Sequence, residues 1–245
     1  MTPEAYRRQR LTAMGIVSWR QRQGRQVPSE PVPEKLAAPP VPVLDQPGDD
    51  LAALRVAVRD CRQCELHQSR TQTVFGSGSR QADLFIVGEA PGAEEDAQGE
   101  PFVGRAGQLL NAMLAAIGLQ REQVYIANIL KCRPPGNRDP QPEEVARCGS
   151  YLDRQIQLVA PRLILAVGRV AAQNLLEVST PIGKMRGREY QHRASAVPVL
   201  VTYHPAYLLR SPREKRKAWE DLKRVASLLR ICREATPQPR SCPGS

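Results

Sequence analysis

The stretch LFIVGEAPG, residues 84–92, passes without a break from an apolar run into a turn. Its first four residues are all apolar, which is typical of a short strand buried on both faces. Two glycines and a proline then end the regular structure, and Glu89 lies directly after the strand. Because open α/β sheets bind their ligands beyond the carboxyl ends of their strands, this stretch predicts an α/β fold with Glu89 at the ligand-binding edge.

Three further apolar runs repeat the pattern, at residues 124–127, 163–167 and 197–202. Amphipathic stretches with helical periodicity lie before, between and after these runs, at residues 49–60, 106–117, 142–159, 169–177 and 214–231. Strands that alternate with helices in this way form βαβ units and a parallel sheet. We therefore predict an α/β fold with three α/β/α layers and a central four-stranded parallel sheet.

The composition is that of an ordinary globular protein: 245 residues, 41% of them hydrophobic and 24% charged. The net charge of +10 favours a polyanionic partner, although charge alone does not choose between DNA, RNA and a membrane surface. The sequence has neither an apolar run of 18 residues nor the apolar core of a secretory signal. We therefore expect a cytoplasmic protein without a membrane partner.

The distribution of prolines predicts the domain organisation. Seven prolines fall between residues 28 and 47, where apolar periodicity disappears, so residues 27–48 are expected to form a stiff linker. Residues 1–26 carry six arginines against one acid at amphipathic spacing, and they are either a solvated tail or a docking peptide for a protein partner or DNA backbone. A single catalytic domain is expected at 49–233 and a disordered tail at 234–245.

Polar residues follow three of the four predicted strands. Glu89 ends the first, Asn128 ends the second, and His204 comes just after the fourth. Alone, a glutamate in such a loop or a histidine at a strand end is more often structural than catalytic. A carboxylate, an amide and an imidazole at one sheet edge, however, predict a shared pocket with chemical function.

Four of the six cysteines are spaced as metal ligands, namely Cys61, Cys64, Cys132 and Cys148. A C-x-x-C pair with two distant thiols suits either a tetrahedral zinc ion or a [4Fe–4S] cluster, and the spacing does not separate the two. The remaining cysteines, Cys232 and Cys242, lie in a region rich in Pro and Arg and have no matching partners.

Four sequence blocks occur in a fixed order along the chain: GEAPGAEED at 88–96, PFVGRAG at 101–107, Asn128 followed by KCRPPGNR at 131–138, and HPAYLLR at 204–210. Together they resemble the iron–sulfur-containing (family 4) uracil-DNA glycosylases over about residues 50–231. The resemblance implies a DNA repair enzyme that hydrolyses the N-glycosidic bond of deoxyuridine, releases uracil and leaves an abasic site. It also favours the [4Fe–4S] cluster over zinc as the cofactor.

The resemblance assigns roles to the residues at the predicted edge. Glu89 would orient water and offset positive charge on the sugar, with Glu95 second and sharing that work. Asn128 would read the edge of uracil, which presents both an acceptor and a donor. His204 would donate to O2 of the departing base.

Further residues would bind the extruded nucleotide and its flanks. Phe102 is expected to offer an exposed face for stacking, and the backbone of Ala90 and Gly92 would face O2 and a neighbouring phosphate. The expected DNA contacts are Arg105, Lys131, Arg133, Arg138, Tyr207, Leu208 and Arg210. For Leu208, core packing is an almost equal alternative to a wedge in the base stack.

Two alternative functions are also compatible with the sequence. One is a non-catalytic iron–sulfur DNA-binding module of the same fold, and the other is a glycosylase with broader specificity for deaminated bases. The expected partner is uracil-containing DNA, single- or double-stranded, bound by a monomer associated with the nucleoid.

Overall fold

The structure, a computed structural model, describes residues 50–234 of the chain. The predicted N-terminal segment (1–26) and linker (27–48) lie outside the described residues, as does the predicted tail from residue 235 onward. No helix in the described part of the chain combines the length and apolarity needed to cross a bilayer.

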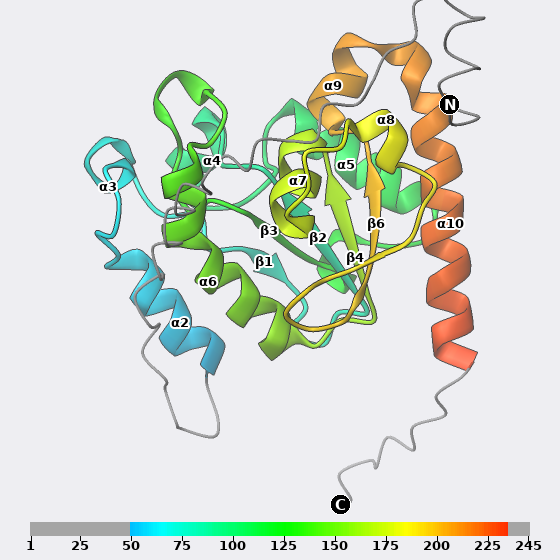
Figure 1. Cartoon of the computed structure of the whole chain (residues 1–245), viewed down its shortest axis with the longest axis horizontal. Helices are drawn as coiled ribbons and strands as arrows, with labels where there is room; N and C mark the ends of the chain where they lie inside the picture. Colours follow the sequence, from blue (N-terminus) through cyan, green and yellow to red (C-terminus); the bar gives the residue numbers. More distant parts are fainter. Residues whose placement is uncertain (1–49, 235–245) are drawn as a thin grey trace, which may run out of the picture. The chain divides into compact units, whose positions relative to one another are not determined.

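A mixed sheet of six strands forms the centre of the described region, in the order β1-β3-β2-β4-β6-β5 (Figure 1). The strands are β1 (Ser77–Gly78), β2 (Leu84–Gly88), β3 (Tyr125–Asn128), β4 (Leu163–Val167), β5 (Tyr190–Gln191) and β6 (Pro198–Thr202). The four central strands are parallel, and Gly88 pairs with Asn128 where β2 and β3 end. The carboxyl ends of β2, β3, β4 and β6 therefore meet at one edge.

The α/β class and the four predicted parallel strands are confirmed, but a four-stranded sheet is incomplete. The edge strands β1 and β5 add antiparallel pairings to β3 and β6. Each edge strand has only two residues, too few for apolar alternation to appear in the sequence.

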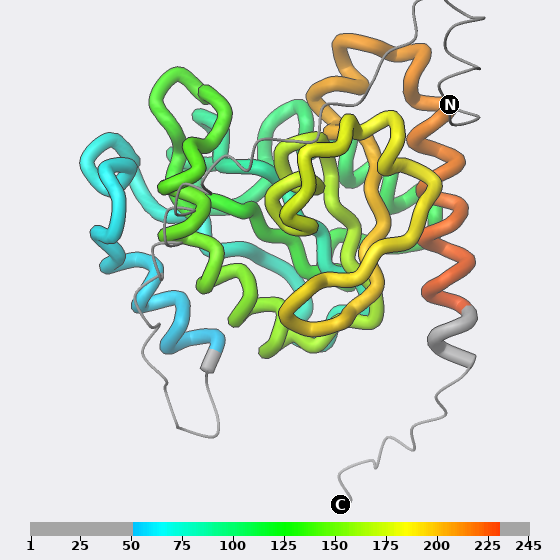
Figure 2. The backbone as a smooth tube through the Cα atoms, in the orientation of Figure 1, coloured from blue at the N-terminus to red at the C-terminus, as the bar shows by residue number. Residues whose placement is uncertain are grey.

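Helices cover both faces of the sheet (Figures 1 and 2). Side chains of α2 (Asp50–Arg59), α6 (Pro142–Val159), α7 (Arg169–Leu176) and α8 (Ile182–Met185) pack in one core cluster. Those of α5 (Arg105–Ala116), α9 (Pro205–Arg210) and α10 (Lys215–Glu234) pack in the other. The short elements are α3 (Leu66–Ser69), α4 (Ala93–Gln98), η1 (Arg121–Gln123), η2 (Pro135–Asn137) and η3 (Pro212–Glu214).

Strand β2 explains why the apolar runs are continuous. Phe85 and Val87 belong to the cluster on one face, while Leu84 and Ile86 belong to the cluster on the other. All four are at most 1% exposed, so each adds about 1.5–3 kcal/mol of burial free energy to the fold. This rigid central layer fixes the positions of the loops at its carboxyl edge.

Candidate active site

A cavity of about 440 Å³ lies at the carboxyl edge of the central strands. This volume is within the usual range for sites that bind small molecules. Its lining includes residues that follow β2, β3 and β6, among them Glu89, Asn128 and His204. The structure therefore brings together the three polar residues that the sequence placed at the ends of separate strands.

Asn128 presents a buried amide without a complete set of partners. The residue is 2% exposed, and its side-chain Oδ1 accepts no hydrogen bond from the described residues. Leaving a buried polar atom unpaired costs about 1–3 kcal/mol. Because Asn128 lines the cavity, a ligand with a hydrogen-bond donor would satisfy this atom there.

His204 is held in one tautomer by the start of α9. Its Nδ1 accepts a hydrogen bond of 3.1 Å from the backbone N–H of Ala206, so the hydrogen of the neutral ring belongs on Nε2. Burial, together with the positive charge of Arg210, lowers the pKa of His204 to about 4. The imidazole is thus a neutral hydrogen-bond donor at physiological pH. Gly168 makes room for this ring, because a Cβ there would lie 3.0 Å from the His204 Cβ.

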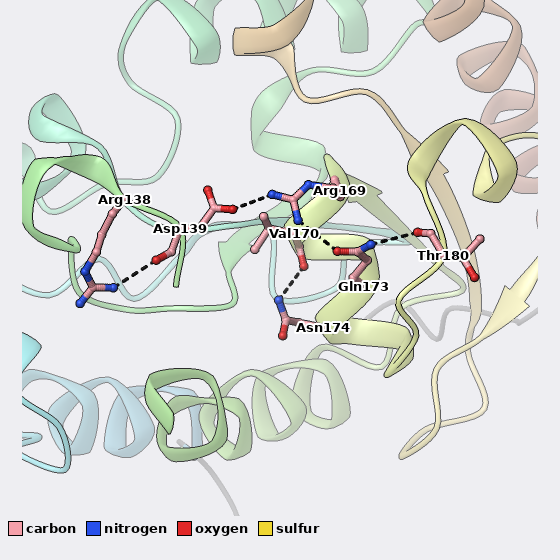
Figure 3. Close-up of polar contacts among 7 residues, drawn as sticks. All are labelled: Arg138, Asp139, Arg169, Val170, Gln173, Asn174 and Thr180. Carbon is pink, nitrogen blue, oxygen red and sulfur yellow. Dashed lines mark hydrogen bonds and ion pairs between the residues drawn. The ribbon is translucent and has the colours of Figure 1, made fainter. Parts of the chain in front are cut away.

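Glu89 is a half-buried carboxylate with an unusual pKa. Burial and, to a smaller extent, the negative charge of Asp139 raise the pKa to about 7, against the opposing effect of the positive charge of Arg169. Asp139 and Arg169 form an ion pair of 2.6 Å beside the cavity, and Arg138 donates to the Asp139 carbonyl (Figure 3). A carboxyl group with this pKa can exchange a proton near neutral pH.

Glu95 holds the surrounding loops together. One carboxylate oxygen accepts the N–H of Gly92 at 3.1 Å, and the other accepts those of Val103 and Gly104 at 3.0 and 3.1 Å. Both oxygens are therefore engaged with backbone groups. These contacts hold the loops in place, and the expected share of Glu95 in water activation stays a prediction.

Phe102 is buried and not exposed as expected, with 6% of its surface accessible. Its ring centroid lies 5.6 Å from that of His204, at an interplanar angle of 33°. Gly88 permits this arrangement, because a Cβ there would come within 2.7 Å of the Phe102 ring. The ring still lines the cavity, as do Ala90 and Gly92.

Two of the expected DNA contacts are buried. Lys131 is 1% exposed, and its ammonium donates to the Asn128 carbonyl at 2.9 Å and to Gln155 Oε1 at 2.5 Å. Leu208 is 1% exposed and packs in the core, which was the alternative to a wedge in the base stack. Neither side chain is therefore accessible to a phosphate or a base stack.

The other expected contacts lie at the surface. Tyr207 and its neighbour Leu209 are each 36% exposed, and Arg210 is also exposed. Arg105 is exposed at the start of α5. Both remaining arginines are partly exposed and have partners: Arg133 donates to Asn137, and Arg138 forms a two-bond ion pair with Glu144.

The four predicted metal ligands line a second cavity: Cys61, Cys64, Cys132 and Cys148. Figure 2 shows the segment after α2 next to the first half of α6, and Cys148 is the seventh residue of that helix. Two hydrogen bonds already point at these sulfurs, one from the Arg70 guanidinium to Cys132 Sγ at 3.1 Å and one from the backbone N–H of Lys131 to Cys148 Sγ at 3.3 Å.

The protonation of these thiols depends on what they bind. Burial raises the pKa values of Cys64, Cys132 and Cys148, that of Cys148 to about 12. The thiols would therefore stay neutral without a cation to displace their protons. Within residues 50–234, no three His, Cys, Asp or Glu side chains are grouped so that they could hold one metal ion, so the four cysteines line the cavity without forming a site for a single ion.

The sequence did not indicate two residues of the cavity wall and a third residue that is paired with one of them. Asn137 and Asp139 line the cavity from the loop before α6, and Arg169 forms an ion pair with Asp139. Asn137 has a positive φ of 54°, in a Pro-Pro-Gly-Asn turn that could have indicated a special position. No comparable signal marks Arg169, because its pairing spans 30 residues of sequence.

The chain is similar to known proteins over most of the described region. The family model of the uracil DNA glycosylase superfamily matches residues 75–223. A Type-4 uracil-DNA glycosylase from Archaeoglobus fulgidus is 48% identical over 177 residues, which cover 70% of this chain and 89% of that protein. Type-4 uracil-DNA glycosylases from Sulfurisphaera tokodaii and Pyrobaculum aerophilum are 42% and 44% identical, over 74% and 71% of this chain and 85% and 91% of those proteins.

Proposed function

The chain belongs to the uracil-DNA glycosylase superfamily, and from this we propose that it hydrolyses the N-glycosidic bond of deoxyuridine in DNA. The products are free uracil and an abasic site, so the protein acts in DNA repair. The observation that carries the proposal is the Oδ1 of Asn128, which has no hydrogen-bond partner among the described residues and lines the same cavity as His204 and Phe102.

Asn128 would select the base. Its Oδ1 accepts the N3–H of uracil and its amide NH₂ donates to O4. Cytosine has an acceptor at N3 and a donor at C4, so the same amide orientation would face two mismatched groups. A site whose buried polar groups are left unpaired rejects the wrong ligand strongly. Phe102 would stack on the extruded ring, an interaction worth about 1–3 kcal/mol.

His204 and Glu89 would stabilise the two charges that develop as the bond breaks. The C1′–N1 electron pair leaves with uracil, and the Nε2–H of His204 donates a hydrogen bond to O2 of that anion. The carboxylate of Glu89 offsets the positive charge on the sugar and accepts a proton from the water that attacks C1′. Because His204 is neutral, it supplies a hydrogen bond and keeps its proton.

Glu95, Ala90 and Gly92 would shape the base-binding wall. The three bonds from Glu95 to backbone N–H groups fix the loop after β2 against the loop before α5. The loop backbone at Ala90 and Gly92 would then approach O2 and a neighbouring phosphate.

The DNA strand would follow exposed side chains near the cavity. Arg138 and Arg210 line it, Arg105 is exposed at the start of α5, and Tyr207 and Leu209 are available to fill the gap left by the extruded base. We expect a monomer to act on single- or double-stranded substrate in the cytoplasm. Residues 1–26 remain a proposed docking segment for a protein partner.

The four cysteines fit a [4Fe–4S] cluster. They provide four soft ligands around one cavity, with hydrogen bonds from Arg70 and from the Lys131 backbone to two of the sulfurs. When bound, the cluster supplies a structural link between the segment after α2 and the segment from residue 132 to α6. Zinc is the weaker alternative.

A uracil-release assay tests the function. Full-length protein is incubated with an oligonucleotide containing one deoxyuridine, and abasic sites are then cleaved with alkali. We expect cleavage at the uracil position and its loss in Glu89→Gln, whereas Glu94→Gln, which changes an exposed acid of α4, should remain active. Wild-type protein that cleaves no more than Glu89→Gln would refute the proposal. An iron assay and the visible spectrum of the same sample test the cofactor.

A further inference from the structure

Arg121 contacts the backbone of the turn that contains Phe102, although it belongs to a different segment of the chain. In η1, its guanidinium donates to the carbonyl oxygens of both Pro101 and Phe102, the latter at 3.2 Å. The same group reaches Ser77 Oγ in β1 and Asn111 Oδ1 in α5, each at 3.4 Å. Arg121 therefore joins the Phe102 turn to the sheet edge and to α5.

The turn that Arg121 holds is strained and tightly packed. Phe102 has a φ of 54°, a left-handed conformation that costs a non-glycine residue roughly 1–2 kcal/mol. Its carbonyl also lies against Gly107, where a Cβ would come within 1.8 Å of the Phe102 oxygen. A conformation of this kind persists only when surrounding contacts determine it. The bonds from Arg121 are such contacts.

We propose that Arg121 is a positioning residue for base binding, which holds the backbone of Phe102 so that its ring lies beside His204 and forms one wall of the base pocket. The inference rests on the proposed function, because it assigns Phe102 to stacking. Arg121 itself does not line the cavity, so it would act through Phe102 and not on the substrate.

The guanidinium is suited to this task for a geometric reason. Its planar fork presents several N–H donors, so one side chain can bond two successive carbonyls and two further oxygens at once. A lysine offers a single ammonium and cannot span the same set. Burial also lowers the pKa of Arg121, which remains a cation.

A double-mutant cycle tests whether Arg121 acts through Phe102. The variants are Arg121→Met, Phe102→Leu and the combination, assayed for kcat and KM with a single-uracil oligonucleotide below all unfolding midpoints. We expect Arg121→Met to lower kcat/KM about tenfold, as for the loss of one stacked aromatic, and to add little in the Phe102→Leu background. Independent, additive losses would overturn the inference.

Two further variants separate positioning from general stability. Arg224→Met is the matched control, because Arg224 also bonds a backbone carbonyl and a carboxylate, at 2.6 and 2.7 Å, on α10. It should lower Tm without lowering kcat/KM. Arg121→Gln keeps an amide donor on a shorter side chain and provides a milder variant if Arg121→Met fails to fold. Equal kinetic losses in Arg224→Met and Arg121→Met would contradict the inference.

A spectroscopic readout is independent of activity. The chain has three phenylalanines, so labelling with fluorophenylalanine gives three ¹⁹F resonances that single Phe→Leu variants assign. We expect Arg121→Met to shift or broaden the Phe102 resonance and to leave those of Phe75 and Phe85 in place. Three unchanged resonances would refute the positioning role, whereas failure of the wild-type protein to release uracil would refute only the proposed function.

Discussion

The backbone N–H of Ala206 donates to Nδ1 of His204 at 3.1 Å, and this single bond determines how the imidazole can act. Nδ1 is occupied as an acceptor, so the neutral ring carries its hydrogen on Nε2. Burial lowers the pKa of His204 to about 4, and the neutral form therefore persists throughout the physiological range. The group that changes charge near neutral pH is Glu89, whose pKa is raised to about 7.

This difference predicts the pH dependence of uracil release. The Glu89 carboxylate is the active form, so kcat/KM should be constant above about pH 8 and should fall about tenfold per pH unit well below pH 7. His204 should add no inflection between pH 5 and 8. A profile measured from pH 5 to 9 checks this, and an acid limb centred near pH 4.5 would contradict the raised pKa of Glu89.

Removing one or the other charge of the ion pair beside Glu89 should shift the acid limb of the pH profile, in opposite directions for the two residues. Asp139→Asn removes the negative charge that raises the pKa of Glu89, so the limb should move to lower pH. Arg169→Gln removes the positive charge that lowers this pKa, so the limb should move to higher pH. The two profiles are compared at one ionic strength, because salt screens exposed charges. Shifts of the same sign would rule out electrostatic control of Glu89 by this pair.

Replacing Asn128 should reduce uracil release without lowering the Tm of the protein. Asn128→Leu removes a buried oxygen that accepts no hydrogen bond from the described residues, so Tm should stay equal or rise. Uracil release should fall at least about 10²-fold, because base recognition is lost. The matched control is Gln155→Leu, another buried amide, whose bonds to Lys131, Phe75 and Tyr125 should make the loss lower Tm. Equal Tm losses in both variants would refute this account.

Much of this fold could be predicted because its determinants are local. Strand β4 and helix α6 have the predicted bounds, 163–167 and 142–159. A continuous apolar run predicts the strand, and an amphipathic stretch that begins with Pro142 predicts the helix. The meeting of Glu89, Asn128 and His204 also followed from strand ends alone, because parallel strands finish at one edge.

What the sequence could not reveal was burial and long-range pairing. Lys131 lies in a basic stretch of sequence, which predicts an exposed side chain. In the structure its ammonium instead donates to Gln155, which is 24 residues away in the sequence. The contact of Arg121 with the Phe102 turn likewise depends on how α5 returns the chain to the sheet edge. The Phe102 ring is buried for the same reason, since its packing partner His204 is 102 residues further along.

The cysteine cavity gives a prediction about metal content. Cys148→Ser should lose the iron and the visible absorbance of the purified protein and lower its Tm, because a ligand to the proposed cluster is removed. Cys242→Ser is the control, since Cys242 lies outside the described residues and was not assigned as a ligand. Full iron content in Cys148→Ser would refute this ligand assignment, and stoichiometric zinc in the wild-type protein would replace the proposed cofactor.

Lys131 and Arg210 should respond differently to loss of charge, although both were expected to contact DNA. Lys131→Met leaves the Asn128 carbonyl and Gln155 Oε1 without their buried donor, so it should destabilise the protein by about 1–3 kcal/mol and impair uracil release. Its effect on DNA affinity should not depend on salt.

Arg210→Gln removes an exposed charge at the cavity, so it should weaken DNA binding and reduce the slope of log K against log[salt] by about 1. Binding isotherms at several salt concentrations, with denaturation midpoints for both variants, check this. If Lys131→Met changed the salt slope and left stability intact, its ammonium would have to reach phosphate, in conflict with its burial.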